Sequence, residues 1–320
     1  MPPPAQAEQR QGCQRIVSVS ETECGAKILA DSVHSPSPPA VNAATRDALT
    51  LPGPRDHDFG PMNLQLENKT ALITGSTKGI GFAIAQALAA EGANVIVNGR
   101  SEDSTQAAAR KIGGGTRGVA ADVSTAAGCA ELMRQVPEVD ILVNNAGIFE
   151  PKPFVEIPDA DWERFYQVNV MSGVRLTRAC LPGMLGRNWG RVIFMSSESG
   201  VQIPEEMIHY GMTKAAELAL VNGIAQLTRS SGVTVNAVLP GPTASEGVTD
   251  FVNTLASSAQ QTPAEFEKEF FRSVRPTSLL QRFATVDEVA HTVAYLCSPL
   301  ASATNGAAVR VDGGVLRATA

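Results

Sequence analysis

From residue 64 onward, short apolar runs alternate with longer stretches of helical pattern. The runs lie at residues 70–74, 94–98, 117–121, 139–144, 191–196, 233–239 and 308–312. Most are continuously apolar, which is typical of strands covered on both faces. Strand–helix alternation implies right-handed crossovers and a parallel sheet. The sequence therefore predicts an α/β fold: a Rossmann-type doubly wound parallel sheet of about seven strands, with helices on both faces.

The stretch after the first run has one apolar face. Its apolar residues follow the i, i+3, i+4, i+7, i+8 spacing of a helix that packs on a sheet: Ile80, Ala83, Ile84, Ala87 and Leu88. Ligands of doubly wound sheets bind beyond the carboxyl ends of the strands. We therefore expect the functional residues directly after each apolar run.

The first 61 residues have a different composition. They hold nine of the twenty prolines, and Phe59 is their only aromatic residue, so they cannot bury enough surface to offset the entropy of ordering. We expect residues 1–63 to be a disordered extension and residues 64–320 to be a single dinucleotide-binding catalytic domain. A targeting role for the extension, and a natural start at Met62, remain alternatives.

Charge and composition narrow the partners. The net charge of -6 disfavours nucleic acid and anionic membranes, and the sequence lacks an apolar run of about 18 residues that could span a bilayer. The five cysteines, at 13, 24, 129, 180 and 297, lack the paired spacings of a zinc site or a disulfide framework. We expect a cytoplasmic protein without a metal site, in which Cys180 and Cys297 are small core residues.

A glycine-rich loop separates the first run from the first helix. It reads Gly75-Ser76-Thr77-Lys78-Gly79-Ile80-Gly81. Glycines permit the tight turn and the close approach of backbone N–H groups to a pyrophosphate at the helix N-terminus. The placement between strand and helix predicts a dinucleotide site.

The end of the second run indicates which dinucleotide. An Asp or Glu there would bind the ribose 2'-hydroxyl of NAD, but the chain reads Asn98-Gly99-Arg100. Arg100 and Lys78 offer two cations to a 2'-phosphate. NADP is therefore favoured as the cofactor, and NAD is the alternative. The non-functional alternative is that both cations are solvated surface charges.

Tyr210 and Lys214 are four residues apart in a helical stretch, and this spacing places them on one face. A nearby ammonium would lower the pKa of the phenol from about 10 and make it a usable general acid and base. This interpretation requires that the ring face the pocket and that the amine not be engaged elsewhere. Ser197 follows the fifth run, thirteen residues before Tyr210.

With these motifs the chain resembles the short-chain dehydrogenase/reductase family over about residues 66–316, and in particular its 3-oxoacyl-thioester reductases. The glycine motif, the Ser–Tyr–Lys spacing, Asn144-Asn145-Ala146-Gly147, Pro240-Gly241 and Val311-Asp312-Gly313-Gly314 all match. The resemblance implies that Ser197 hydrogen-bonds the substrate oxygen, that Tyr210 transfers its proton, that Lys214 holds the nicotinamide ribose, and that Asn169 positions a water molecule. It implies a structural role for Asn144 as a clamp between central strands.

The resemblance also extends the cofactor site. It adds residues after the third, fourth and sixth runs: Asp122, Val123, Asn145, Ala146, Gly147, Pro240, Gly241 and Thr243. Asp122 would hydrogen-bond the adenine. His209 would point away from Tyr210 and is expected to be non-catalytic.

The substrate is the least determined part. Residues 243–283 would form a lid that sets specificity, and the further candidates for the pocket wall are Ile148, Glu198, Ile203 and Met207. Glu205 and Glu206 are expected to be helix-start charges. The helical stretches 159–185 and 206–229 correspond to those that pair subunits in the family, so a homotetramer is expected, with a dimer as the alternative.

The predicted activity is an NADP-dependent oxidoreductase acting on a small carbonyl compound or secondary alcohol, with Tyr210 as general acid/base. Two alternatives remain at this point. One is an NAD-linked alcohol dehydrogenase, and the other is an NADP-binding scaffold or redox sensor without turnover.

Overall fold

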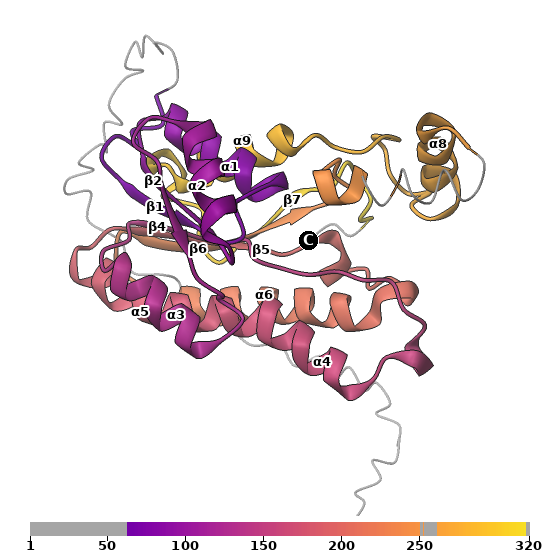
Figure 1. The fold of residues 1–320 in the computed structure, drawn as a ribbon, viewed down its shortest axis with the longest axis horizontal. Helices are drawn as coiled ribbons and strands as arrows, with labels where there is room; N and C mark the ends of the chain where they lie inside the picture. The colour runs from indigo at the N-terminus through magenta and orange to yellow at the C-terminus, as the bar shows by residue number, and fades with distance from the viewer. Residues whose placement is uncertain (1–62, 250–251, 253–260, 318–320) are drawn as a thin grey trace, which may run out of the picture. The chain divides into compact units, whose positions relative to one another are not determined.

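The computed structural model describes residues 63–249, 252 and 261–317, and these residues form a sheet of seven parallel strands (Figure 1). The strands are β1 (Thr70–Ile73), β2 (Asn94–Gly99), β3 (Arg117–Ala120), β4 (Ile141–Asn144), β5 (Gly190–Met195), β6 (Val233–Pro240) and β7 (Ala308–Val311). Their order is β3-β2-β1-β4-β5-β6-β7. The predicted fold class and all seven strands are confirmed, with strand ends within two residues of the prediction.

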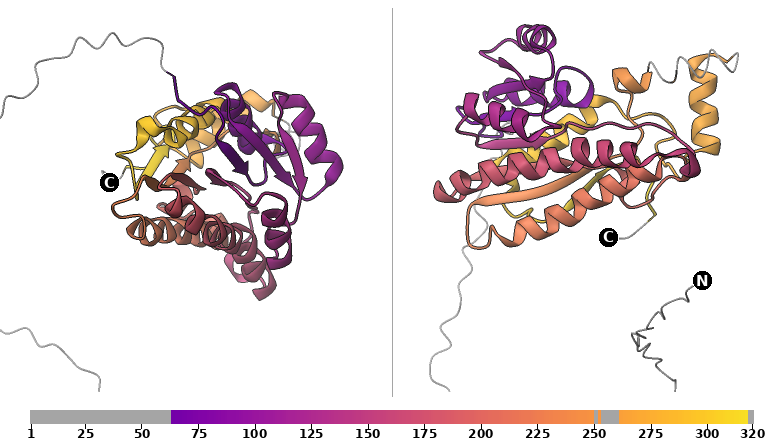
Figure 2. Two further views of the ribbon diagram at one scale, coloured as in Figure 1. Left: turned by 90° about the vertical axis from the view of Figure 1, so that its left-hand side faces the viewer. Right: turned by 60° about the horizontal axis from the view of Figure 1, so that its bottom comes forward.

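Helices cover both faces of the sheet, as Figures 1 and 2 show. On one face lie α1 (Gly79–Ala90), α2 (Glu102–Ile112) and α9 (Val286–Cys297). On the other lie α3 (Ala126–Gln135), α5 (Ser172–Gly186) and α6 (Ile208–Gln226). In a strand–helix repeat with short connections, both faces of the sheet are buried only if helices pack on both sides.

Successive strand residues serve the two cores in turn. In β1, Ile73 belongs to the core under α1 and α9, whereas Leu72 belongs to the core above α5 and α6. Val143 and Leu142 of β4 divide in the same way. Side chains alternate along a strand, so a strand buried on both sides must be apolar throughout. This is the physical reason for the continuous apolar runs in the sequence.

The helical stretch predicted over 159–185 is divided in three. Helix α4 (Asp159–Phe165) continues into the π-helical segment η2 (Tyr166–Met171) and then into α5. The π-helical turns place Asn169, which is 2% exposed, toward the interior. Short π segments within longer helices frequently mark functional positions.

The remaining described helices are short or peripheral. They include the 3₁₀ segments η1 (Phe154–Glu156), η3 (Glu198–Gly200), η4 (Glu205–Met207) and η5 (Pro299–Ala301), and the helix α8 (Pro263–Ser273). Segments η3 and η4 follow β5 and precede α6, and α8 lies within the predicted lid.

Two sequence expectations fall wholly or partly on residues outside this description. The N-terminal extension lies there except for Asn63, as do residues 250–251 and 253–260 of the predicted lid. Over the described residues, no helix is long and apolar enough to cross a membrane. The same residues contain no cluster of three or more side chains suited to a metal ion.

Candidate active site

The carboxyl ends of the parallel strands open into a cavity of about 500 Å³. Its wall combines residues that follow different strands and are far apart in the sequence. They include Ile80 after β1, Asn145 and Gly147 after β4, Ser196 and Ser197 after β5, Tyr210 and Lys214 in α6, and Pro240, Gly241 and Thr243 at the end of β6. Because all strands run in one direction, their ends meet at one edge.

The glycine loop is shaped for close backbone approach. Gly75 and Gly79 have φ angles of +59° and +61°, which favour glycine. A Cβ on Gly81 would lie 2.4 Å from Asn145 Nδ2 and 2.7 Å from the Gly75 oxygen. Helix α1 begins after Lys78 without a side-chain cap, so no side chain at the N-cap occupies its first N–H groups. Such a helix start suits a pyrophosphate.

The end of β2 is joined to this loop. The Ser76 backbone N–H donates to the Asn98 backbone oxygen over 2.9 Å, and the Asn98 backbone N–H donates to Ser76 Oγ over 3.0 Å. Thr77 is the nearest neighbour of Gly99. Lys78 and Arg100, which flank these contacts, are exposed, and neither pairs with a described side chain. Two unpaired cations therefore follow the segments that meet here.

The predicted adenine-side residues follow β3. Asp122 is exposed and accepts from the Ser124 amide over 3.0 Å, whereas Val123 is buried. Neither residue lines the catalytic cavity, and neither do Lys78 and Arg100. The predicted dinucleotide site therefore extends from the cavity along the strand ends toward β3.

The clamp between β1 and β4 is made by Asn145, not by Asn144 as the family resemblance suggested. Asn145 Nδ2 donates to the oxygens of Thr74 and Gly75 over 2.9 and 3.1 Å. The Thr74 hydroxyl in return accepts from the amides of Asn145 and Ala146. Asn144 instead donates to the Thr177 hydroxyl of α5 over 3.1 Å. The two side chains point to opposite faces because they are consecutive residues.

Tyr210 and Ser197 both line the cavity. Tyr210 lies in the first turn of α6, and its ring makes an edge contact with Phe149 at 6.4 Å between centroids. The Ser197 hydroxyl donates to the Glu198 carboxylate and accepts from the Ser199 amide over 3.1 Å. To bind a substrate oxygen, this hydroxyl would have to turn its hydrogen away from Glu198.

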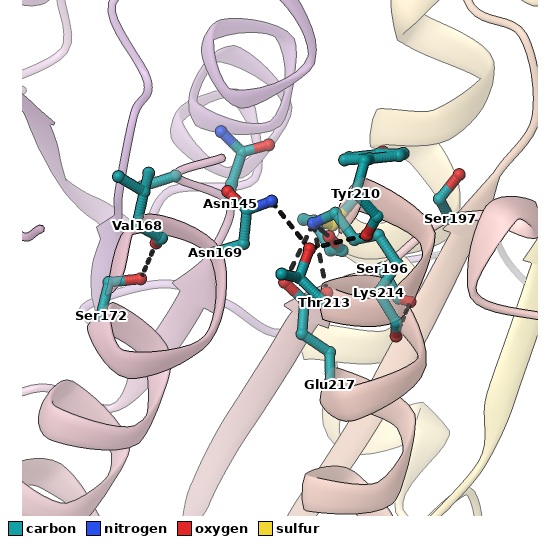
Figure 3. A network of polar contacts seen from close by, with 12 residues as sticks. Asn145, Val168, Asn169, Ser172, Ser196, Ser197, Tyr210, Thr213, Lys214 and Glu217 are labelled. Atoms are coloured by element: carbon teal, nitrogen blue, oxygen red, sulfur yellow. Dashed lines mark hydrogen bonds and ion pairs between the residues drawn. The ribbon is translucent and has the colours of Figure 1, made fainter. Parts of the chain in front are cut away.

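Lys214 is buried and forms an ion pair. Its Nζ donates to the Met195 oxygen over 2.8 Å and to Glu217 Oε1 over 2.9 Å, and it lies 5.7 Å from the centre of the Tyr210 ring. Figure 3 shows Tyr210, Lys214 and Glu217 along one face of α6. The Tyr210 ring thus faces the pocket, as the sequence interpretation requires. The Lys214 amine does not meet its requirement, because it is engaged by Glu217.

The expected lowering of the Tyr210 pKa is also corrected by the structure. The pKa of Tyr210 is raised rather than lowered, first by burial and then by the negative charge of Glu198. Glu217 raises it further, whereas Arg275 and hydrogen bonding to Ser197 act in the opposite direction. The expected lowering by the Lys214 ammonium is not among the causes of this shift, and Lys214 is paired with Glu217 at 2.9 Å.

Glu217 is itself perturbed. Burial raises its pKa to about 7, against the opposing effect of the Lys214 charge and hydrogen bond. It is 2% exposed, and its carboxylate accepts hydrogen bonds from Lys214 Nζ over 2.9 and 3.2 Å. A buried carboxylate is costly unless paired, so the two residues depend on each other.

Asn169 lies beside this pair. Its Oδ1 accepts from the Ile148 amide over 2.8 Å, and its Nδ2 donates to the Ile148 oxygen and to the Thr213 hydroxyl over 3.1 and 2.9 Å. A Cβ on Gly147 would lie 3.6 Å from both Asn169 Oδ1 and Lys214 Nζ. The structure therefore brings Asn169 and Lys214 together around Gly147, while the predicted water-positioning role stays a prediction.

The substrate side differs from the prediction at two points. Ile148, Glu198 and Met207 line the cavity, but Ile203 does not: it is 47% exposed and packs against Gly211. Glu206 is not a plain helix-start charge. It lines the cavity and pairs with Arg275, with 3.4 Å between Nη1 and Oε1. Glu205 is exposed, as expected of a helix-start charge.

Sequence reasoning missed Arg275 and Glu217 entirely. Arg275 follows α8 and forms an ion pair with Glu198, with 3.2 Å between Nε and Oε1. It lies 77 residues from its partner, and no local spacing signals such a contact. Glu217 could have been noticed, because it lies three residues after Lys214 in an otherwise apolar helical stretch.

His209 faces away from the cavity, as the helix geometry predicts. It is fully buried against Phe165 and Trp162, with 4.0 and 5.9 Å between ring centres. Burial lowers its pKa, which keeps the ring neutral in this aromatic cluster. Cys180 and Cys297 are buried free thiols whose pKa burial raises to about 12.

Known proteins share both the sequence and this architecture. A family model described as enoyl-(acyl carrier protein) reductase matches residues 75–316. The uncharacterized oxidoreductase YvaG of Bacillus subtilis is 48% identical over 265 residues, which cover 80% of this chain and 99% of YvaG. The chain is a short-chain dehydrogenase/reductase.

Two further relatives show the breadth of this family. The 3-oxoacyl-[acyl-carrier-protein] reductase FabG of Aquifex aeolicus is 33% identical over 79% of this chain and 100% of its own length. The structure of L-sorbose reductase from Gluconobacter frateurii, complexed with NADPH and L-sorbose, has 31% identity and a TM-score of 0.77, and covers 80% of this chain and 100% of its own. The assignment as an oxidoreductase therefore stands on the family as well as on the motifs.

Replacing Glu217 with Gln should change how stability depends on pH. A carboxyl whose pKa is raised from 4.5 to about 7 on folding stabilises the native state below pH 4.5, and this contribution is lost as pH rises toward 7. The Glu217 carboxyl should therefore lower the unfolding free energy of the natural chain by about 2 kcal/mol between pH 5 and 7. Glu217→Gln should abolish this loss.

Urea unfolding at the two pH values measures this difference. Glu163→Gln, the same change at an exposed position of α4, should keep the pH difference of the natural chain. An unaltered pH difference in Glu217→Gln would contradict the assignment.

Proposed function

We propose that this short-chain dehydrogenase/reductase uses NADP to interconvert a small carbonyl compound and its secondary alcohol, with Tyr210 as the proton-transfer residue. The observation that carries the proposal is the meeting of Tyr210, Ser197 and Lys214 in one cavity whose wall continues into the glycine loop at Ile80 and to Asn145, which holds that loop. A cavity of this kind with a few convergent polar groups is the usual form of a small-molecule site.

The residues present fit the cofactor. Gly81 lies so close to Asn145 and Gly75 that a Cβ would clash with both, and the uncapped start of α1 leaves its first N–H groups to a pyrophosphate. Bound there, the nicotinamide would supply or accept the hydride. Gly75–Gly81 would hold the phosphates, Asp122 and Val123 the adenine, and Asn145–Gly147, Lys214 and Pro240–Thr243 the nicotinamide half.

The residues of this chain would divide the remaining work. Ser197 would turn its hydroxyl from Glu198 to the substrate oxygen, and Tyr210 would give that oxygen its proton in reduction or take it in oxidation. Burial keeps the Tyr210 phenol protonated at neutral pH, which suits a proton donor and hence the reductive direction. Lys214 would hold the ribose and Asn169 would position a water molecule that relays protons outward.

A homo-oligomer is part of the proposal. An apolar hollow on η2 and α6 is lined by Tyr166, Val170, Leu220 and Leu227, among others, and Leu227 is 66% exposed. Exposed apolar surface of this kind marks an interaction site. A second copy of the chain is the proposed occupant, and a tetramer is the expected assembly.

One observation favours a second function. Lys214 is held by Glu217, as would suit an NADP-binding module that does not turn over. The two functions differ in whether Tyr210 matters for NADPH oxidation, and the substitution below separates them.

Tyr210→Phe removes the phenolic proton and leaves the ring in place. General acid catalysis contributes about 100- to 10,000-fold, so kcat for carbonyl reduction should fall at least about 100-fold while the Kd for NADPH stays nearly unchanged. NADPH oxidation across acyl thioesters, diketones, steroids and quinones measures the first quantity, and fluorescence titration measures the second. Tyr295→Phe, at a half-exposed tyrosine of α9 that does not line the cavity, is the matched control. Equal turnover in Tyr210→Phe would refute the role of Tyr210.

Arg100→Ala tests the choice of cofactor. If Arg100 binds the 2'-phosphate, kcat/KM for NADPH should fall about 10- to 100-fold, the value of one charge-assisted hydrogen bond, while the value for NADH should barely change. Arg110→Ala, at an exposed arginine in the last turn of α2, should change neither. A natural chain that prefers NADH strongly would overturn the assignment of NADP.

A further inference from the structure

The cavity wall carries a three-membered charge cluster that the proposed chemistry does not use. Arg275 contacts Glu198 through Nε at 3.2 Å and Glu206 through Nη1 at 3.4 Å. The side chains of Arg275 and Glu198 are 11% and 7% exposed, and that of Glu206 is 39% exposed. All three line the cavity. One guanidinium therefore faces two carboxylates.

The cluster leaves one negative charge uncompensated. Outside this cluster, Lys214 is the one other charged side chain among the described residues that line the cavity. The Glu217 carboxylate pairs with the Lys214 ammonium at 2.9 Å and balances its charge. Of the charges that act on Tyr210, Glu198 and Glu217 raise its pKa and Arg275 lowers it, with Glu198 the largest of the three. The field at the reacting end of the cavity is therefore negative.

The rest of the wall offers little to an anion. Helix α8 and the segments around it contribute Phe266, Phe270, Val274 and Phe283, and Phe270 stacks on Phe283 with 5.2 Å between ring centres. Ile148 and Met207 are apolar as well. An anion that enters would lose its hydration without gaining an uncompensated cation, because both carboxylates already occupy Arg275.

We propose that the Glu198–Arg275–Glu206 cluster makes this pocket select neutral carbonyl substrates with an apolar body and reject those with a carboxylate or phosphate near the carbonyl. This inference rests on the proposed function, since it names the substrate class of the same site. It distinguishes ketones, esters and thioesters from oxo acids of equal size.

Acetoacetamide and acetoacetate form a matched pair for the test, because they share the ketone and the number of heavy atoms and differ in charge. One unit charge about 6 Å away in a medium of effective dielectric about 20 corresponds to roughly 100-fold. We expect kcat/KM with NADPH to favour the amide by about 100-fold. The amide should also bind more tightly than the acid, and saturation-transfer NMR measures the ratio of the two Kd values.

Two neighbouring glutamates supply the variant and its control. Glu206→Gln removes the uncompensated charge, so by the same estimate it should lower the amide-to-acid ratio about 100-fold, to near one. Glu205→Gln removes an equal charge one residue away, on an exposed side chain that does not line the cavity, and should keep the ratio of the natural chain.

The outcomes separate this inference from the proposed function. An amide-to-acid ratio near one, a preference for the acid, or a ratio that Glu206→Gln does not lower would overturn the charge selection, whether or not ketones are reduced. If no carbonyl compound is reduced, the proposed function fails, and the NMR ratio still decides the charge selection.

Discussion

The site depends on a constraint of the sheet. Seven strands run in one direction, so the segments that follow β1, β4, β5 and β6 meet at one edge although they are spread from residue 75 to residue 243. The pairing of Asn145 with Thr74 and Gly75 fixes the glycine loop against the end of β4. Without this parallel arrangement, Tyr210 and the glycine loop would not share a cavity.

A second constraint is electrostatic. Lys214 and Glu217 are both almost fully buried and are paired at 2.9 Å, so each would be costly without the other. Beside this pair, burial and the negative charges of Glu198 and Glu217 raise the pKa of the Tyr210 phenol. In the proposed function, such a phenol would donate a proton rather than remove one. The Glu198–Arg275–Glu206 cluster differs from this pair, because one guanidinium faces two carboxylates at the substrate end of the cavity.

Much of the fold and part of the site could be predicted from the sequence. Continuous apolar runs reveal buried parallel strands because both faces need apolar side chains, and the glycine loop and the Tyr210–Lys214 spacing are local signals. Contacts between distant segments could not be predicted in this way. Arg275 meets Glu198 across 77 residues, and Asn145 reaches Thr74 across 71 residues whereas Asn144 donates to Thr177 of α5. The pKa of Tyr210 was misjudged for the same reason, since its value depends on burial and on Glu198 and Glu217 in three dimensions.

The central claim is that this edge of the sheet brings NADP and a carbonyl carbon together for hydride transfer. The most direct measurement supplies NADPH carrying deuterium at the transferable position of the nicotinamide, together with a ketone that the protein reduces, and follows the label by mass spectrometry and NMR. The account predicts that the deuterium appears on the carbinol carbon of the alcohol product. A reduced product whose carbinol carbon carries only hydrogen from solvent would contradict it.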